Sequence, residues 1–232
     1  MHTSFRDRAD AGRVLAGKLE RYADRADVVV LALPRGGVPV ADEVARALGA
    51  PLDVFVVRKL GVPGHEEYAM GAIASGGVRV LNGDVVDSLG IADGTIDAVA
   101  ARESRELERR ERVFRGDRPA PEVEGRTVLL VDDGIATGAT MRAAVAALRQ
   151  LGARRIVAAV PTAAPSSAAT IRAEVDEFVA VITPLEFSSV GQWYDDFPQT
   201  SDDEVCAILK EARQRAAPQD APDAQAHGRR TR

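Results

Sequence analysis

Short runs of β-branched and aliphatic residues alternate with helix-like segments along most of this 232-residue chain. The first run, at 28–33, is followed by a helix-like stretch at 38–48 and a second run at 52–57, and an amphipathic helix is predicted before them at 8–24. The first run is short and apolar throughout, which is typical of a strand buried on both faces. Strand, helix and strand in this order form a βαβ unit, which predicts a parallel sheet covered by helices.

The same alternation returns in the second half of the chain. It predicts strands at 127–131, 156–160 and 178–182, with helices at 139–151 and 166–174 between them. Glycines stand just after two of the predicted helices, where a helix commonly ends in the left-handed conformation. The expected fold class is therefore α/β, a parallel sheet flanked by helices.

Residues 58–125 differ in composition from the two halves that they separate. They begin with a glycine-rich stretch, contain a strand candidate at 78–81 and end in a charged helix at 97–115, whose acid-first i,i+4 pairs are typical of a solvated surface helix. The expected organisation is a single domain at 1–215, with a core at 25–183, a hood and loop insert at 58–125, a C-terminal hood element at 184–215 and a disordered tail at 216–232.

Composition limits the partners that this chain can have. A net charge of -5 and a pI of about 5.4 argue against general nucleic-acid binding, which needs clustered Lys and Arg, but allow a small phosphorylated ligand. The single cysteine, Cys206, cannot form an intramolecular disulfide and fits a reducing cytoplasm. No apolar run approaches the roughly 20 residues that span a bilayer. We expect a cytoplasmic protein with no nucleic-acid or membrane partner.

The segment 128–140 carries the strongest chemical signal. A predicted strand ends in two acids, Asp132 and Asp133, and is followed by a loop of small residues and then a helix. Ligands of parallel α/β sheets bind beyond the carboxyl ends of the strands, which is where this loop lies. The chain has neither the glycine-lysine order of a Walker A loop nor a dinucleotide-binding fingerprint.

The loop has the parts of an anion-binding site. Gly134 and Gly138 permit close approach of the backbone, and the amides that open the following helix favour negative charge. Thr137 and Thr140 add hydroxyl donors. The two carboxylates would repel a phosphate, so their natural partners are sugar hydroxyls and a hydrated cation.

This segment resembles the phosphoribosyl-pyrophosphate (PRPP) motif of type I phosphoribosyltransferases: four apolar residues, two acids, a short loop with Thr-Gly, and then Thr. The resemblance implies the fold of that family, with a small hood and an inserted helix. It also implies a Mg²⁺-dependent transfer of the 5-phosphoribosyl group of PRPP to a nitrogenous base, or the reverse, with release of pyrophosphate, as in nucleotide salvage. PRPP, a nucleobase-like acceptor and Mg²⁺ are then the expected partners, and a homodimer is a candidate assembly.

The family's roles transfer onto matching residues. Asp132 and Asp133 would bind the ribose hydroxyls, directly or through magnesium. Many members have, at the position of Ala136, an acid that accepts a proton from a 6-oxopurine, and alanine here resembles the adenine-using branch instead. The 5-phosphate would be bound by the residues of the loop: Gly134, Ala136, Thr137, Gly138, Ala139 and Thr140.

Two further segments resemble the pyrophosphate-binding part of the family. Arg35 and Gly36 would contact pyrophosphate in the turn after the first strand, with a cis peptide between Pro34 and Arg35. Arg58 and Lys59 resemble the family's basic pair, which neutralises pyrophosphate, and residues 61–70 resemble its mobile catalytic loop. The catalytic residues implied are Arg35, Lys59, Asp132 and Asp133.

The stretch at 187–195 resembles the hood of purine-using members. Phe187 or Trp193 would stack on the base, and Asp195 would join Asp132 and Asp133 at the metal; a small packing cluster is the alternative interpretation. A non-catalytic domain that senses PRPP or a nucleotide is the main alternative function. A serine hydrolase is disfavoured, because the chain has no G-x-S-x-G segment.

Overall fold

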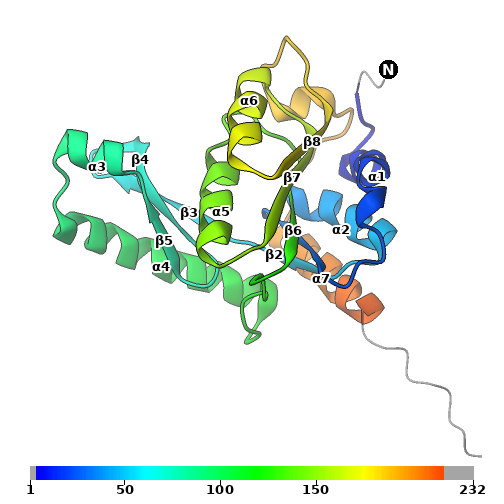
Figure 1. Ribbon diagram of the computed structural model, residues 1–232, viewed down its shortest axis with the longest axis horizontal. Coiled ribbons are helices and arrows are strands. Elements are labelled where there is room, and N and C mark those ends of the chain that lie inside the picture. The colour runs from blue at the N-terminus through cyan, green and yellow to red at the C-terminus, as the bar shows by residue number, and fades with distance from the viewer. Residues whose placement is uncertain (1–3, 217–232) are drawn as a thin grey trace, which may run out of the picture.

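The computed structural model describes residues 4–216, which form a five-stranded parallel sheet with helices on both faces (Figure 1). The strand order is β2-β1-β6-β7-β8, and every neighbouring pair is parallel. This architecture confirms the predicted α/β fold class. The strands are β1 (Val28–Ala32), β2 (Leu52–Val54), β6 (Thr127–Val131), β7 (Arg155–Thr162) and β8 (Glu177–Ile182).

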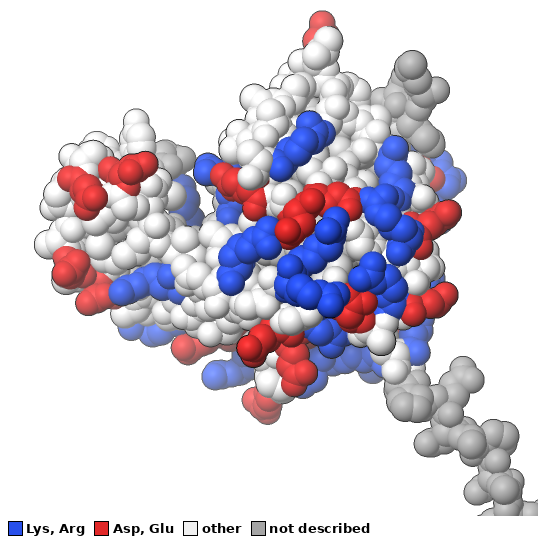
Figure 2. All heavy atoms as spheres, viewed as in Figure 1, with Lys and Arg blue, Asp and Glu red and all other residues white. Residues whose placement is uncertain are grey.

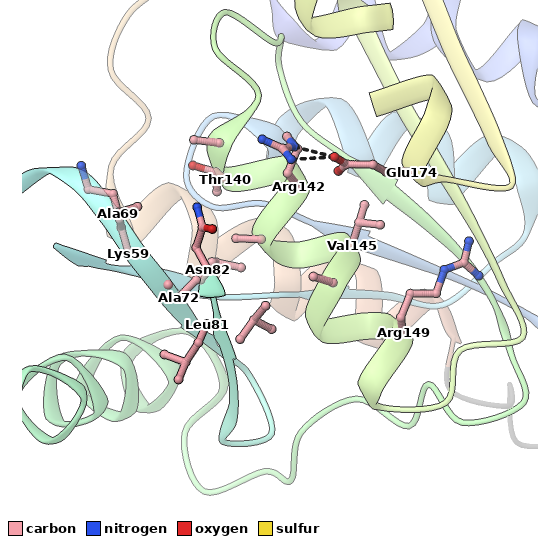
Figure 3. Close-up of a pocket in the computed structure, with 16 residues that line it drawn as sticks. Lys59, Ala69, Ala72, Leu81, Asn82, Thr140, Arg142, Val145, Arg149 and Glu174 are labelled. Carbon is pink, nitrogen blue, oxygen red and sulfur yellow. Dashed lines mark hydrogen bonds and ion pairs between the residues drawn. The ribbon is translucent and has the colours of Figure 1, made fainter. Parts of the chain in front are cut away.

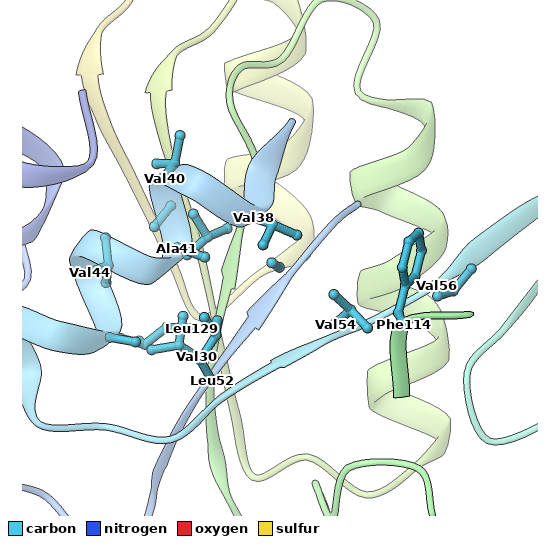
Figure 4. Close-up of a cluster of buried hydrophobic side chains, with 14 of the residues drawn as sticks. Val30, Val38, Val40, Ala41, Val44, Leu52, Val54, Val56, Phe114 and Leu129 are labelled. Carbon is cyan, nitrogen blue, oxygen red and sulfur yellow. The ribbon is translucent and has the colours of Figure 1, made fainter. Parts of the chain in front are cut away.

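The sheet separates two hydrophobic cores, because alternate residues of a strand point to opposite faces. On one face, Val30 and Leu129 pack against α2, as Figure 4 shows, and α1 and α7 lie on the same side. On the other face, Leu31 and Leu130 pack with α5 and α6. The helices concerned are α1 (Arg8–Lys18), α2 (Gly37–Leu48), α5 (Ala139–Gln150), α6 (Pro165–Glu174) and α7 (Asp202–Ala216), and a short 3-10 turn, η1 (Glu20–Tyr22), follows α1.

A second unit, which we call the wing, extends from one edge of the molecule (Figure 1). It contains an antiparallel sheet in the order β3-β4-β5 and two helices. Its elements are β3 (Val57–Val62), β4 (His65–Ala74), β5 (Val78–Leu81), α3 (Gly83–Leu89) and α4 (Asp93–Arg115).

The wing corrects two sequence-based expectations. The strand predicted at 52–57 is divided, since β2 ends at Val54 and β3 begins a different sheet at Val57. Ser75 fixes this crossing, because its hydroxyl accepts the Val56 amide hydrogen and its own amide donates back to the Val56 carbonyl, both at 2.9 Å. No strand was expected at 61–70, which resembles the family's mobile catalytic loop, but these residues form the arms and turn of the β3–β4 hairpin.

Helix α4 is also more than a solvated surface helix. Its side chains Ile96, Leu107 and Phe114 are buried in the core shared with α2 and α7. Arg115 is buried as well, and it donates to the Asp53 carboxylate at 3.0 Å and to the Val54 carbonyl at 2.6 Å. The predicted i,i+4 pairs Glu106–Arg110 and Glu111–Arg115 form, whereas Glu108 and Arg112 make no ion pair within residues 4–216.

The chain beyond β8 divides into two parts. Residues 184–201, which we call the hood segment, are mostly irregular and include the 3-10 turn η2 (Val190–Trp193). Helix α7 then packs on α2 and α4, away from the hood segment that was expected to extend to 215. Residues 217–232, most of the predicted tail, lie outside the described part of the chain. Within the described part, no helix is long and apolar enough to cross a membrane.

Candidate active site

Two loops meet at the carboxyl edge of the sheet, where β1 and β6 lie side by side. The strand order reverses direction between these strands, and ligands of open α/β sheets bind at such a switch point. The loops touch: a Cβ atom added to Gly36 would lie 2.0 Å from Asp133 Oδ2, and one added to Gly37 would lie 2.8 Å from the Val131 carbonyl oxygen. The fold therefore places the predicted pyrophosphate turn directly against the predicted ribose acids.

The acid pair is partly buried and closely coupled. Asp132 Oδ1 accepts the backbone N–H of Asp133 at 2.9 Å, and Asp132 makes no salt bridge within residues 4–216. Burial and the negative charge of Asp133 raise the pKa of Asp132. Burial also raises the pKa of Asp133, and this rise is opposed by the Arg8 guanidinium, whose Nε donates to Asp133 Oδ2 at 2.9 Å. The pair is thus a concentrated acceptor site with one fixed cation beside it.

The loop after the acids presents its donors to solvent. Ala136, Thr137, Ala139 and Thr140 are exposed at the start of α5, in the position expected of an anion-binding helix terminus. Gly138 precedes the helix with φ 77°, a left-handed conformation that favours glycine.

Glycine is required at the start of the same loop for a different reason. A Cβ atom at Gly134 would lie 2.5 Å from the Val190 side chain, so the loop packs tightly under the hood segment.

The turn after β1 has the expected cis peptide bond between Pro34 and Arg35. Gly36 then caps α2, so this turn opens a second helix toward the same edge of the sheet. Arg35 Nη1 lies 3.5 Å from a carboxylate oxygen of Asp202, and both side chains are substantially exposed. Such an exposed pair contributes little to stability, which leaves Arg35 able to reorient toward an anionic ligand.

Arg58 and Lys59 are neighbours in β3, and their side chains have different surroundings. Arg58 donates twice to Glu103 Oε2 on α4, at 3.0 and 2.6 Å. Lys59 instead lines a cavity of about 580 Å³ between the wing sheet and α5, together with Ala139 and Thr140 (Figure 3). Lys59, but not Arg58, therefore faces the cavity that the start of α5 also lines. The two residues do not form the side-by-side basic pair that was predicted.

The cavity is largely apolar. Figure 3 shows Thr140 and the Arg142–Glu174 ion pair, at 2.7 Å, beside each other near the start of α5, with Lys59 across the cavity on the wing. Apolar residues of both walls line it: Val57, Ala69, Ala72, Val80, Leu81, Val145 and Ala146. The cavity thus adjoins the predicted 5-phosphate loop on the wing side.

The hood residues predicted to bind base and metal are engaged with other partners. Phe187 and Trp193 stack on each other, with ring centroids 6.5 Å apart and planes inclined by 28°. Asp195 accepts a hydrogen bond from the Ser4 hydroxyl at 2.9 Å. No three His, Cys, Asp or Glu side chains gather as a metal site within residues 4–216, so Asp195 does not complete a set with Asp132 and Asp133. Two carboxylates still fit a hard cation such as magnesium, which usually takes its other ligands from water and substrate phosphates.

Two residues that contact the acid pair, Arg8 and Tyr194, were not predicted from the sequence. Besides its bond to Asp133, Arg8 donates to the Pro198 carbonyl at 2.6 Å, and its guanidinium lies 3.8 Å from the centre of the Phe197 ring. The Tyr194 hydroxyl donates to the Asp133 carbonyl at 2.5 Å. Burial and the charge of Asp133 raise the pKa of Tyr194, so the hydroxyl remains a donor. Arg8 is 125 residues from Asp133 in the chain, and no local pattern indicates this contact.

A parallel sheet whose switch point holds two acids, a glycine-containing loop at the start of one helix and a similar turn at the start of another defines an α/β protein with a candidate ligand site at that edge. The chain belongs to the phosphoribosyl transferase domain family, whose sequence profile matches residues 4–191. The fold is that of type I phosphoribosyltransferases.

Individual proteins extend this family assignment. A Mycobacterium tuberculosis H37Rv protein, named only provisionally as a phosphoribosyl transferase, is 51% identical over 222 residues, which is 96% of this chain and 50% of that protein. The matching protein of strain CDC 1551 has the same identity and coverage, so the chain spans about half the length of these curated relatives. The crystal structure of TT1426 from Thermus thermophilus is 46% identical, covers 90% of this chain and 98% of its own, and superposes with a TM-score of 0.81.

Proposed function

We propose that this chain binds PRPP with magnesium and transfers its 5-phosphoribosyl group to a nitrogenous acceptor, releasing pyrophosphate. The observation that carries the proposal is the contact between the two loops. Because Gly36 lies against Asp133, one ligand can reach the pyrophosphate turn and the ribose acids together. PRPP has a diphosphate on the carbon next to its diol, which matches that adjacency.

Each part of the donor has a candidate partner among the residues of the site. The ribose hydroxyls would bind Asp132 and Asp133, and the 5-phosphate would bind the amides and hydroxyls at 136–140. The pyrophosphate would lie between Arg35, Gly36 and Lys59, while Arg58 stays with Glu103. A magnesium ion held by the two carboxylates would supply positive charge beside the leaving group.

The reaction itself is a displacement at the anomeric carbon. The lone pair of the acceptor nitrogen forms the new bond while the bond to pyrophosphate oxygen breaks, and the electron pair leaves with pyrophosphate. Positive charge develops on the sugar, so stabilisation of the leaving group by Arg35 and Lys59 lowers the barrier. Ala136 cannot accept a proton, which favours an adenine-like acceptor, as in nucleotide salvage, over a 6-oxopurine.

A PRPP sensor is the second candidate, favoured by the engagement of Arg58 with Glu103. With Arg58 paired to Glu103, one fewer cation is available to stabilise a leaving pyrophosphate. Pyrophosphate release, measured with PRPP, magnesium and a panel of nucleobases, separates the two functions. Release with at least one base supports the enzyme, whereas tight PRPP binding without release from any base supports the sensor.

The donor site is tested by calorimetry with PRPP and magnesium. We expect the double variant Asp132→Asn, Asp133→Asn to lose donor binding while remaining folded, because amides cannot replace two anionic acceptors. Asp195→Asn serves as the matched control and should bind like the wild type, since Asp195 contacts Ser4. Retained affinity in the double variant would contradict the assignment of the ribose site.

A further inference from the structure

Arg8 begins helix α1, yet its side chain ends inside the candidate active site. Its Nε donates to Asp133 Oδ2 at 2.9 Å, and the side chain is only 10% exposed. The remaining guanidinium contacts belong to the hood segment, through the Pro198 carbonyl and the Phe197 ring. One buried cation thus joins the second ribose acid to the segment that covers the site.

The Arg8–Asp133 pair also lies against the pyrophosphate turn. A Cβ atom on Gly36 would lie 2.0 Å from Asp133 Oδ2 and 3.3 Å from Arg8 Nε. The carboxylate is therefore confined between a guanidinium and the backbone of the turn. Because Nε donates to Oδ2, rotation of the carboxylate away from this orientation would break a charge-assisted hydrogen bond.

The backbone that bears Arg8 is bonded to the hood segment as well. The Phe5 amide donates to the Trp193 carbonyl, and the Asp195 amide donates back to the Phe5 carbonyl, each at 2.8 Å. The Asp196 amide adds a bond to the Arg6 carbonyl at 2.8 Å. The start of the chain and the hood segment therefore hold Arg8 from both sides.

The positive charge of Arg8 supports a role in organising the acid pair for ligand binding. Asp132 and Asp133 are adjacent carboxylates in partly buried surroundings, so each disfavours the charge of the other. Arg8 is the cation that is bonded directly to the pair among the described residues. Removal of one partner from such a pair leaves an uncompensated carboxylate, which would reorient toward solvent or another donor.

We propose that Arg8 is a positioning residue of the ribose site: it orients Asp133 toward the sugar diol and makes that orientation depend on the hood segment. This inference rests on the proposed binding of PRPP. It requires that loss of Arg8 weaken the binding of ligands that carry the diol, and weaken much less the binding of ligands that carry only the diphosphate. The reason is that Arg8 is bonded to Asp133 and not to the pyrophosphate turn.

The inference is tested by titrating two probes, ribose 5-phosphate and inorganic pyrophosphate, into the full chain in the presence of magnesium. The variants are Arg8→Ala, Arg8→Gln and Arg8→Lys. Arg13→Ala is the matched control, since Arg13 lies on the same helix and pairs with Asp10 and Glu43 at the surface. Thermal unfolding identifies the variants that fold. If Arg8→Ala does not fold, Arg8→Gln replaces it, because glutamine retains an aliphatic stem and a hydrogen-bond donor.

We expect the uncharged variant to bind ribose 5-phosphate at least tenfold more weakly and pyrophosphate within twofold of wild type. Arg8→Lys should recover part of the loss, because it restores a cation at Asp133, and Arg13→Ala should match wild type for both probes. A general weakening of the fold would lower both affinities and would not be rescued by lysine.

Four results would overturn the inference. They are an unchanged affinity for ribose 5-phosphate, a tighter affinity, an equal loss for pyrophosphate, and a lysine variant as weak as the uncharged one. A wild-type chain that binds neither ribose 5-phosphate nor PRPP would instead refute the proposed function, and the inference with it. If the wild type binds ribose 5-phosphate and the uncharged variant binds it equally well, only the proposed role of Arg8 is refuted.

Discussion

Gly36 and Arg8 show how much of this site depends on single residues that are distant in the chain. Both contact Asp133, Gly36 through the absence of a side chain and Arg8 through a buried guanidinium. The positions of the acids, of the loop after β6 and of the glycine turn after β1 could be predicted, because each is a local pattern that follows a buried strand. Arg8 could not, because its contact requires α1 and β6 to meet across the fold, which no spacing in the sequence indicates.

Gly36→Ala tests the contact between the two loops. Its Cβ would lie 2.0 Å from Asp133 Oδ2, so one of the loops must shift. We expect the free energy of unfolding to fall by about 1–3 kcal/mol, as for other overpacked positions, and PRPP affinity to fall with it. Chemical denaturation and calorimetry measure the two effects.

The control for this substitution is Gly94→Ala in α4, where nothing lies within 4 Å of the added atom. It should leave PRPP affinity unchanged and should not destabilise the fold, since alanine favours a helix over glycine. Wild-type PRPP affinity in Gly36→Ala would mean that the two loops act independently.

At the scale of elements, the strands and helices of the core could be predicted from the burial pattern of their residues, whereas those of the wing could not. The central strands β1 and β6 are buried on both faces and are apolar apart from Thr127, and this pattern is readable in one sequence. Strands β3 and β4 contain glycines and charged residues, so their pairing depends on partners that local patterns do not reveal. The strand β3 also separates Arg58 from Lys59, because adjacent side chains of a strand point to opposite faces.

Arg58→Ala and Lys59→Ala form a matched pair on one strand. We expect Lys59→Ala to weaken pyrophosphate binding about tenfold, which is about 1.4 kcal/mol. Arg58→Ala removes one of the two cationic partners of Glu103, the other being Arg102. The Glu103 side chain is 11% exposed, so the substitution should lower the free energy of unfolding by about 1–2 kcal/mol. Calorimetry with pyrophosphate and chemical denaturation report the two quantities.

The expected pattern is a loss of binding in one variant and a loss of stability in the other. Equal losses of pyrophosphate affinity would show that Arg58 leaves Glu103 and joins Lys59 when the ligand binds. That result would restore the predicted basic pair.

For the whole molecule, α7 joins parts that the sequence order separates. It packs on α2, which covers the main sheet, and on α4, which belongs to the wing (Figure 1). Acidic and basic side chains lie interleaved across the face in Figure 2. Wing and sheet are joined by the buried apolar contacts of α7 with α2 and α4, and by Arg115, which donates to Asp53 and to the Val54 carbonyl.

Leu209→Ala tests this role of α7. Leu209 is 1% exposed within the core shared by α2, α4 and α7, so we expect a loss of about 2–5 kcal/mol in the free energy of unfolding. Hydrogen exchange should accelerate in α4 as well as in α2, because both lose the same contact. Lys210→Ala, at an exposed position of the same helix, should change neither. Faster exchange restricted to α7 would show that wing and sheet hold together without it.

Phe5 has a practical consequence for handling this protein. It is fully buried against Tyr194, whose hydroxyl supports the backbone of Asp133. An affinity tag or fusion partner joined rigidly just ahead of Ser4 would displace the Phe5 ring and, through Tyr194, the acid pair. Laboratory preparations that keep a flexible spacer at that end should therefore report truer ligand affinities than tightly fused ones.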